Sequence, residues 1–260
     1  MEMQSYKPGV PSWVDVGCRD PAAAAAFYRA LFGWDVQQGP PETGGYSIAH
    51  LRGKSVAGLG PIPDPNTPPF WLTYVNVDSA DETVEKVTAN GGLVFVAPMD
   101  VLDVGRMAVF ADPMGAVLGV WQPRLHIGAE LVNEPNTLCW NELLTSDVEA
   151  AKAFYGAVFG WGSMTHEHPD DVPDAMAYTE WQLGGASVGG LMLKPPFLAA
   201  EVPSHWVVYF QVVDTDAAVK KAAALGATVL VSPTDIEPGR FAVIEDPGGA
   251  SFAVIALTSN

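Results

Sequence analysis

The sequence predicts an α+β fold of two tandem domains, each built from a pair of β-α-β-β-β modules that form one cup-shaped mixed sheet. The first observation behind this prediction is an internal repeat, because the stretch from Asp20 to Trp34 returns 127 positions later, from Asp147 to Trp161. A second set of matches, such as Trp71 with Trp206, recurs 135 positions on. Third, the 26 glycines and 22 prolines exceed the usual share and indicate many short strands joined by tight turns. The chain is therefore a tandem duplication whose second copy carries about eight additional residues after Trp161.

Each copy is long enough to bury a core of its own, so the repeat divides the chain into two domains. We expect the first domain at residues 1–122, with modules at 10–60 and 70–121. A linker at 123–136 leads to the second domain at 137–260, with modules at 137–193 and 204–256.

The first module opens with a strand at 13–18 and an amphipathic helix with both ends marked. Asp20 can accept hydrogen bonds from the free N–H groups of the first turn, and Pro21 suits the first helical position. Gly33 can take the left-handed conformation that ends a helix. Three strands are expected after the helix, at 34–37, 46–51 and 55–60.

The same order recurs after a proline-rich connector at 61–69, which cannot join the interior of a sheet. The second module is expected to contain a strand at 70–77, a helix at 79–90 and strands at 93–101, 106–111 and 116–121. The second copy repeats the order, with strands at 138–144, 178–183, 187–193, 206–213, 228–236, 240–245 and 250–255, and helices at 147–158 and 214–225.

Charge and hydropathy exclude two kinds of partner. The net charge is −17 and only 13 residues are Lys or Arg, which argues against nucleic acid or an anionic membrane surface. The sequence shows neither a basic start followed by an apolar run nor an 18-residue apolar segment, so we expect a cytoplasmic protein. Cys18 and Cys139 fit no zinc spacing and stand at non-equivalent positions of the two copies.

Several motifs carry a resemblance to a known family. They are Arg19-Asp20 with Ala26-Phe27-Tyr28 and Leu31-Phe32-Gly33-Trp34, the run from Gly105 to Pro113, and the closing turns at 112–115 and 246–249. With four β-α-β-β-β modules, the chain resembles the vicinal-oxygen-chelate superfamily of glyoxalase I, bleomycin-resistance proteins and extradiol dioxygenases over nearly its whole length. It looks most similar to a two-domain, glyoxalase-like subgroup labelled "hydroxylase", some members of which accompany aromatic polyketide antibiotic pathways.

The resemblance implies metal-ligand positions on the first, fifth and eighth strands of each domain. By count these positions hold Trp13, Leu72 and Gly119 in the first copy, and Trp140, Val207 and Ala253 in the second. None of these residues offers an imidazole, carboxylate or thiolate donor, so we expect no metal. The sequence shows no Walker or dinucleotide-binding fingerprint either, and we expect no cofactor. The ligand-type side chains of His166, His168, Asp170 and Asp171 fall in the inserted acidic loop, which we expect to be solvated.

Strand alternation predicts which side chains line the cups. If Val14 and Val16 pack on the helix, Trp13 and Asp15 face the cavity. The second copy places Trp140 and Glu142 there. The fifth strand adds Phe70, Leu72, Tyr74 and Asn76 in the first cup and His205, Val207, Tyr209 and Gln211 in the second. The eighth strand adds Val117 and Trp121 in the first cup and Ser251 and Ile255 in the second.

A carboxylate on an apolar strand is costly to bury without a partner, so Asp15 and Glu142 need an explanation. They could pair structurally with Arg106 or Arg240, anchor a ligand hydroxyl or amine, or act as a general base with a raised pKa. His205, beside a proline connector, is either a histidine at a loop edge or a catalyst.

Two main functions remain open. The first is metal-free binding of a planar aromatic small molecule, as an accessory of an antibiotic pathway or in resistance by sequestration. The second is an enzyme of hydroxylase or oxygenase type, a lyase or an isomerase. A plain interaction protein with shallow cups is a third, and we expect a monomer or weak homodimer. The candidate catalytic residues are Asp15, Glu142, His205 and Tyr209, and the candidate ligand contacts are Trp13, Phe70, Tyr74, Trp121, Trp140 and Gln211.

Overall fold

The computed structural model describes residues 1–62, 64–166, 177–196, 198 and 202–258. Within these residues, the first half of the chain has eight strands, two α-helices and a short 3₁₀ helix. These elements are β1 (Pro11–Cys18), α1 (Pro21–Phe32), β2 (Asp35–Gln38), η1 (Pro41–Thr43), β3 (Ser47–Leu51), β4 (Lys54–Pro61), β5 (Phe70–Asn76), α2 (Ala80–Ala89), β6 (Leu93–Val101), β7 (Gly105–Ala111) and β8 (Val117–Pro123).

The second half repeats this order. Its elements are β9 (Leu138–Thr145), α3 (Val148–Phe159), β10 (Gly162–Thr165), β11 (Thr179–Leu183), β12 (Ala186–Leu193), β13 (His205–Gln211), α4 (Thr215–Ala224), β14 (Thr228–Ile236), β15 (Gly239–Glu245) and β16 (Ser251–Leu257). The predicted elements are all present, with ends that differ by one or two residues. The sequence missed β10, because its four residues are all exposed and show no apolar alternation.

The strands form two eight-stranded mixed sheets with the same topology. The orders are β2-β3-β4-β1-β5-β8-β7-β6 and β10-β11-β12-β9-β13-β16-β15-β14. In each sheet the antiparallel pair β1–β5 or β9–β13 joins two β-α-β-β-β modules, and the parallel pairs β1–β4 and β5–β8 follow from the helical crossovers. The α+β class and the tandem arrangement of cup-forming modules are therefore confirmed.

The predicted signals at the helix ends do what their chemistry suggests. The Asp20 carboxylate accepts hydrogen bonds from the backbone N–H groups of Ala22 and Ala23 at 3.0 Å. Asp147 caps α3 in the same way through the N–H of Ala150. Both helices end at a left-handed glycine, Gly33 with φ 74° and Gly160 with φ 72°. None of the described helices is long and apolar enough to cross a membrane.

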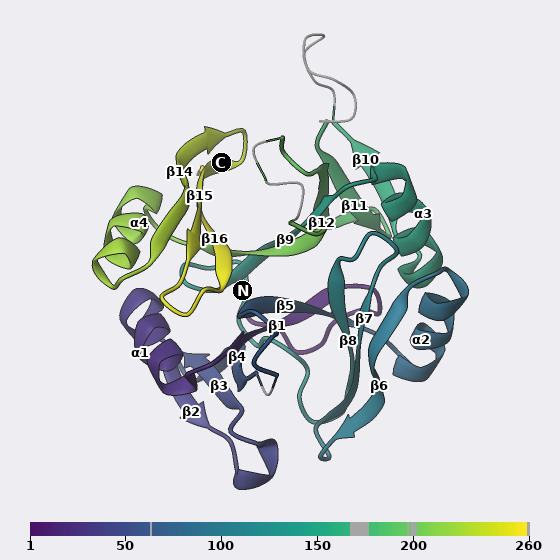
Figure 1. The fold of residues 1–260 in the computed structure, drawn as a ribbon, viewed down its shortest axis with the longest axis horizontal. Coiled ribbons are helices and arrows are strands. Elements are labelled where there is room, and N and C mark those ends of the chain that lie inside the picture. The colour runs from purple at the N-terminus through teal and green to yellow at the C-terminus, as the bar shows by residue number, and fades with distance from the viewer. Residues whose placement is uncertain (63, 167–176, 197, 199–201, 259–260) are drawn as a thin grey trace.

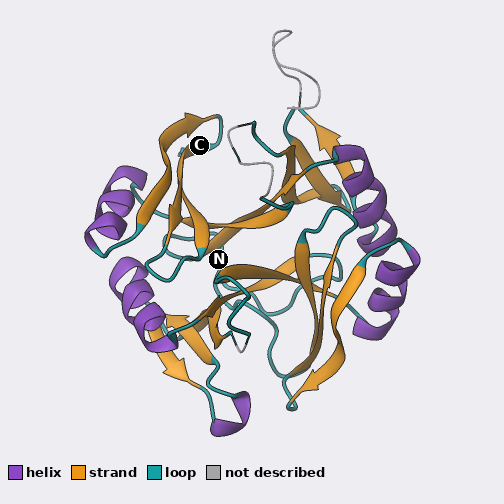
Figure 2. Ribbon diagram, viewed as in Figure 1, coloured by secondary structure: helices purple, strands orange, loops and turns teal. Residues whose placement is uncertain are grey.

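The two sheets share one core through their helix-covered faces. The helices lie at the periphery in two mixed pairs, α1 beside α4 and α2 beside α3 (Figures 1 and 2). Trp71 of β5 and Phe210 of β13 meet between the sheets with ring centroids 5.0 Å apart. Since the helix-covered faces meet in the middle, the opposite face of each sheet points away from the other domain, and these outward faces are the cups.

Candidate functional site

The floor of the first cup is a chain of hydrogen bonds that ends on a carboxylate. Nε1 of Trp13 donates to the Tyr46 hydroxyl at 3.0 Å, and that hydroxyl donates to Oδ2 of Asp15 at 3.0 Å. Burial raises the pKa of Asp15 to about 6, although hydrogen bonds from Tyr46 and Tyr74 pull it down in part. The carboxyl is thus held by tyrosines, not by a cation.

The second cup repeats this chain with a glutamate. Nε1 of Trp140 donates to the Tyr178 hydroxyl at 2.8 Å, and the Tyr209 hydroxyl donates to Oε1 of Glu142 at 3.0 Å. Glu142 is only 8% exposed, and burial raises its pKa to about 7 against the opposing hydrogen bonds of Tyr209 and Tyr178. A carboxyl with such a pKa can gain or lose a proton near neutral pH.

Glycines make room for the tyrosines of both networks. A Cβ atom on Gly58 would lie 1.8 Å from the Tyr46 hydroxyl oxygen, and one on Gly190 would lie 2.1 Å from that of Tyr178. The Tyr74 ring similarly covers Gly119, where a Cβ would lie 2.3 Å from the ring. Because these glycines have no side chain, a tyrosine side chain from the neighbouring segment can lie across the backbone at each of them.

Most of the predicted cup residues lie together as strand alternation suggested. Trp13 stands opposite Tyr74 across the β1–β5 pair, and Trp140 opposite Tyr209 across β9–β13. Trp121 also faces the first cup, because its indole lies over Gly105. The roles assigned to these residues remain predictions.

For three other candidate residues the structure gives contacts with groups other than the carboxyls. His205 stands opposite Leu144, two residues along β13 from the Val207–Glu142 pair. Nδ1 of His205 lies 2.9 Å from the Pro203 carbonyl oxygen. Phe70 pairs with Gly17 at the far end of β5. Gln211 bonds through its backbone to Asn136, at the end of the linker, and to Thr137.

The expected alternative of an arginine partner for the cup carboxylates is wrong. Arg106 pairs with Asp81 and Asp100, and Arg240 pairs with Asp216 and Asp235. Both arginines lie on the opposite face of their strands, so they reach helix and edge-strand carboxylates instead of Asp15 or Glu142.

The linker folds back over the first cup, which the sequence did not indicate. Nε1 of Trp121 donates to the His126 carbonyl oxygen at 2.8 Å, and the His126 ring stands edge-on to Trp13 with centroids 4.5 Å apart. Burial lowers the pKa of His126 to about 4. Trp13 is only 4% exposed beneath it, whereas Trp140 of the second cup is half-buried. A small pocket of about 290 Å³ lies beside this linker, between it and residues 3–4 of the N-terminal segment.

Sequence reasoning also missed Tyr46, Tyr178 and Glu180. The two tyrosines stand just before β3 and β11 at equivalent places, so the repeat itself carried a signal for them. His166, expected in a solvated loop, instead bonds to Glu180 on β11. The rest of that predicted loop cluster, His168, Asp170 and Asp171, lies outside the described residues.

The residues at the implied ligand positions do not fit a metal ion. Leu72 and Val207 stand beside the cup carboxyls, and Gly119 and Ala253 stand beside Tyr74 and Tyr209. None of them has a donor atom on its side chain, and Trp13 and Trp140 present only an indole N–H. Among the described residues no three His, Cys, Asp or Glu side chains are grouped to hold an ion.

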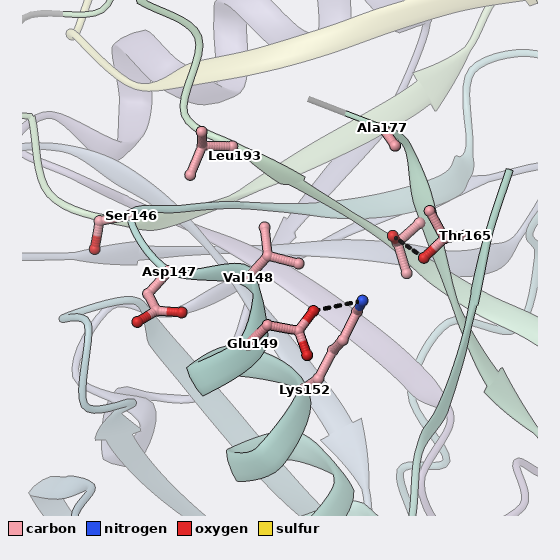
Figure 3. Close-up of a pocket in the computed structure, with 9 residues that line it drawn as sticks. Ser146, Asp147, Val148, Glu149, Lys152, Thr165, Ala177 and Leu193 are labelled. Carbon is pink, nitrogen blue, oxygen red and sulfur yellow. Dashed lines mark hydrogen bonds and ion pairs between the residues drawn. The ribbon is translucent and has the colours of Figure 1, made fainter. Parts of the chain in front are cut away.

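A separate pocket of about 400 Å³ lies at the start of α3, on the helix-covered side of the second sheet (Figure 3). Its polar groups already have partners: Asp147 caps the helix, Lys152 pairs with Glu149, and Thr165 bonds to Thr179. We therefore place the candidate site in the cups, where carboxyls are buried among aromatic rings.

Paired β-α-β-β-β modules with an outward cup on each sheet define a protein of the glyoxalase fold. The family model of the glyoxalase/bleomycin resistance protein/dioxygenase superfamily matches residues 11–120, and the glyoxalase-like domain model matches residues 138–255. The chain belongs to this superfamily.

Similar proteins cover the chain almost from end to end. It is 46% identical over 256 residues to "Putative glyoxylase CFP32" of Mycobacterium tuberculosis, covering 96% of this chain and 95% of that one. It is 37% identical over 270 residues to anthracycline biosynthesis protein DnrV of Streptomyces peucetius, with 98% and 96% covered.

Solved structures share the fold at much lower identity. The 2,3-dioxygenase LapB from Pseudomonas sp. KL28 matches with a TM-score of 0.66 at 14% identity, covering 98% of this chain and 94% of that one. The Mn(II)-bound glyoxalase from Novosphingobium aromaticivorans matches with a TM-score of 0.63 at 16% identity, covering 97% and 85%. At this identity the likeness is one of fold alone.

Proposed function

We propose that the second cup binds a planar aromatic small molecule without a metal ion. The observation that carries the proposal is the Trp140–Tyr178–Glu142–Tyr209 network, which places a half-buried indole beside a carboxyl at the floor of an apolar cup. An aromatic ring stacks well on an indole, and a carboxyl beside it fixes the polar end of a ligand.

The walls of the second cup suit such a ligand. Tyr209 and Phe241 lie with ring centroids 6.3 Å apart, and Val207, Ile255 and Met192 belong to the same apolar cluster. The printed name of the relative DnrV, an anthracycline biosynthesis protein, supports an aromatic natural product as the ligand class. The chain would then serve as an accessory of an antibiotic pathway or sequester such a compound.

The first cup is the weaker candidate, because the linker occupies its opening. A ligand there would have to displace His126 from its contacts with Trp13 and Trp121. In the second cup Leu198 packs against the apolar cluster, but among the described residues no aromatic ring stands against Trp140 as His126 does against Trp13.

One observation favours an acid–base enzyme as the second candidate function. Glu142, with its pKa raised by burial to about 7, could take a proton from a bound substrate and return it elsewhere. Tyr209 would hold the charged form through the hydrogen bond it donates. His205 stands two residues along β13 from Val207, and the contact of its Nδ1 with the Pro203 carbonyl oxygen would hold its ring in place.

Tryptophan fluorescence titration of chelator-treated protein with a panel of planar aromatic compounds tests the proposal. Trp140→Ala should weaken binding about tenfold or more, because stacking and buried apolar area are both lost. Trp13→Ala is the matched control in the first cup and should leave the affinity unchanged.

Mass spectrometry of the ligand after incubation separates binding from catalysis. An unchanged ligand supports the binding function, whereas a product that forms in wild type but not in Glu142→Gln supports the enzyme. If no compound binds more tightly than about 1 mM, or if Trp13→Ala and Trp140→Ala weaken binding equally, the second cup is not the site.

A further inference from the structure

A hydrogen-bonded group of polar side chains lines one wall of the second cup, outside the network of Trp140 and Glu142. Its centre is Glu180 on β11, whose Oε1 lies 2.9 Å from Nε2 of His166. Oε2 of Glu180 accepts from the Ser187 hydroxyl and, at 3.2 Å, from Nε2 of Gln182. Three partners thus hold this carboxylate in one orientation.

Sheet register places Glu180 on the same face as Glu142. The strands β11, β12 and β9 are neighbours (Figure 1), with Glu180 opposite Gly190 and Gly190 opposite Glu142. Trp181, the next residue on β11, points to the other side and packs on Tyr155. Because neighbouring strands lie about 4.8 Å apart, the Cα atoms of the two glutamates are separated by about 10 Å across the cup, with Gly190 between them.

The two glutamates differ in charge state. Burial raises the pKa of Glu180, but the hydrogen bonds from Ser187, His166 and Gln182 outweigh it and hold that pKa below its usual value. Glu180 is therefore an anion at neutral pH. Glu142 loses its proton only near neutrality, because burial dominates there.

The first cup lacks this second carboxylate, so the fold does not require it. Ile48 takes the place of Glu180, since it pairs with Gly58 beside Asp15 as Glu180 pairs with Gly190 beside Glu142. Gly39 takes the place of His166, because each donates its backbone N–H to the carbonyl of the cup tyrosine at 2.9 Å. A half-buried carboxylate that has three hydrogen-bond partners in the second copy and no counterpart in the first points to a role in what the second copy binds.

We propose that Glu180 is a second anionic anchor of the second cup, which selects planar ligands with a cationic group at each end, about 10 Å apart. The inference rests on the proposed function and names its ligand class. A ring over Trp140 and Tyr178 would place one end at Glu142 and the other at Glu180. The charge-assisted hydrogen bond at each end then adds to the stacking.

Fluorescence titration at pH 8, where both glutamates are charged, tests the proposal with two probes. The first is the planar dication diamidinophenylindole, and the second is the monoamidine of the same ring system. Glu180→Gln should weaken the dication about tenfold or more and the monocation less than about threefold, because only the dication reaches both anchors. Glu142→Gln should weaken both probes.

Two controls keep the comparison clean. Glu149→Gln removes one exposed charge on α3 and so matches the change in net charge; it should leave both affinities unchanged. Glu180→Asp keeps the charge and should retain most of the dication affinity, which separates loss of the anchor from loss of folding.

The outcomes distinguish this inference from the proposed function. If Trp140→Ala weakens the binding of both probes while Glu180→Gln changes neither affinity, Glu180 is not a second anchor. The proposal of an aromatic-binding cup would then still hold. Failure of the dication to bind while neutral aromatic compounds do would also overturn the second anchor. Failure of every aromatic compound to bind would remove both proposals together.

Discussion

The pKa values of the two cup carboxyls depend on the groups that surround each side chain. Asp15 and Glu142 stand at equivalent positions among tyrosine hydroxyls, Asp15 partly buried and Glu142 buried. Their pKa values are raised, to about 6 and about 7 respectively. Burial is the larger cause in both cases, because neutral hydroxyl donors compensate less than a cation would. Each carboxyl therefore costs folding free energy whenever it is ionised.

Glu142→Gln should make stability less sensitive to pH. Below pH 4.5 the carboxyl is protonated in both the folded and the unfolded protein, so it contributes no difference. Between pH 4.5 and about 7 the unfolded chain has released a proton that the folded protein keeps, so the free energy of unfolding falls as the pH rises. The total loss reaches up to about 3 kcal/mol and does not grow further above that range. Relative to wild type, the variant should gain up to that amount between pH 4 and pH 8.

Denaturant unfolding at several pH values measures this gain. The exposed Glu237→Gln serves as the control and should run parallel to wild type. A constant difference between Glu142→Gln and wild type across the range would contradict the assignment of a raised pKa.

At the scale of elements, the linker between the domains distinguishes the two cups. Its return across the first cup is fixed by hydrogen bonds from Ala129 N–H to the Ser12 carbonyl oxygen and from Trp121 to the His126 carbonyl oxygen. Gly128, with φ 105°, passes so close to β1 that a Cβ would lie 2.4 Å from the Ser12 carbonyl oxygen. One connection thus joins the domains and covers an aromatic floor.

His126→Ala should uncover Trp13 without unfolding the domain. Loss of the edge-on contacts with Trp13 and Trp121 should cost roughly 0.5–1.5 kcal/mol. Acrylamide should quench tryptophan fluorescence more strongly in this variant, and the added quenching should disappear when Trp13→Phe is also present. Leu125→Ala, which changes an exposed neighbour in the linker, is the control; equal quenching in both variants would show that His126 is not the cover.

At the scale of the whole molecule, the two domains are interlocked. The Tyr28 hydroxyl of α1 donates to Asp246 at 2.7 Å, and the Tyr155 hydroxyl of α3 donates to Asp112 at 3.0 Å. Both bonds are buried, and each ties a helix of one domain to the closing turn of the other. Phe210 and Phe252 complete an aromatic cluster around Tyr28. On its own, either domain would expose the apolar side chains of its helix-covered face to water.

The protein should therefore unfold in one cooperative transition. Tyr28→Phe and Tyr155→Phe should each lower the free energy of unfolding by about 1–3 kcal/mol, because each leaves a buried aspartate oxygen without its donor. The double variant should show nearly additive losses, since the two bonds share no residues. Calorimetry with two resolved transitions, of which Tyr28→Phe shifts only one, would show that the domains unfold independently.

Local and repeated features were predictable from the sequence because they depend on neighbours along the chain. The caps Asp20 and Asp147, the terminal glycines and the period-two alternation of β1 and β9 act within a few residues, and the duplication supplied each signal twice. The same alternation placed Trp13, Asp15, Trp140 and Glu142 on the cup faces.

Only the tertiary structure decided what those side chains meet. Tyr46 reaches Asp15 across 31 positions, His126 reaches Trp13 across the linker, and Tyr28 reaches Asp246 across 218 positions. Such contacts depend on how strands pair and on which glycine leaves room, and neither leaves a periodic trace in the sequence. Glu180 illustrates the point: β11 is only five residues long, and its pairing through Gly190 is what brings this carboxylate into the cup with Glu142.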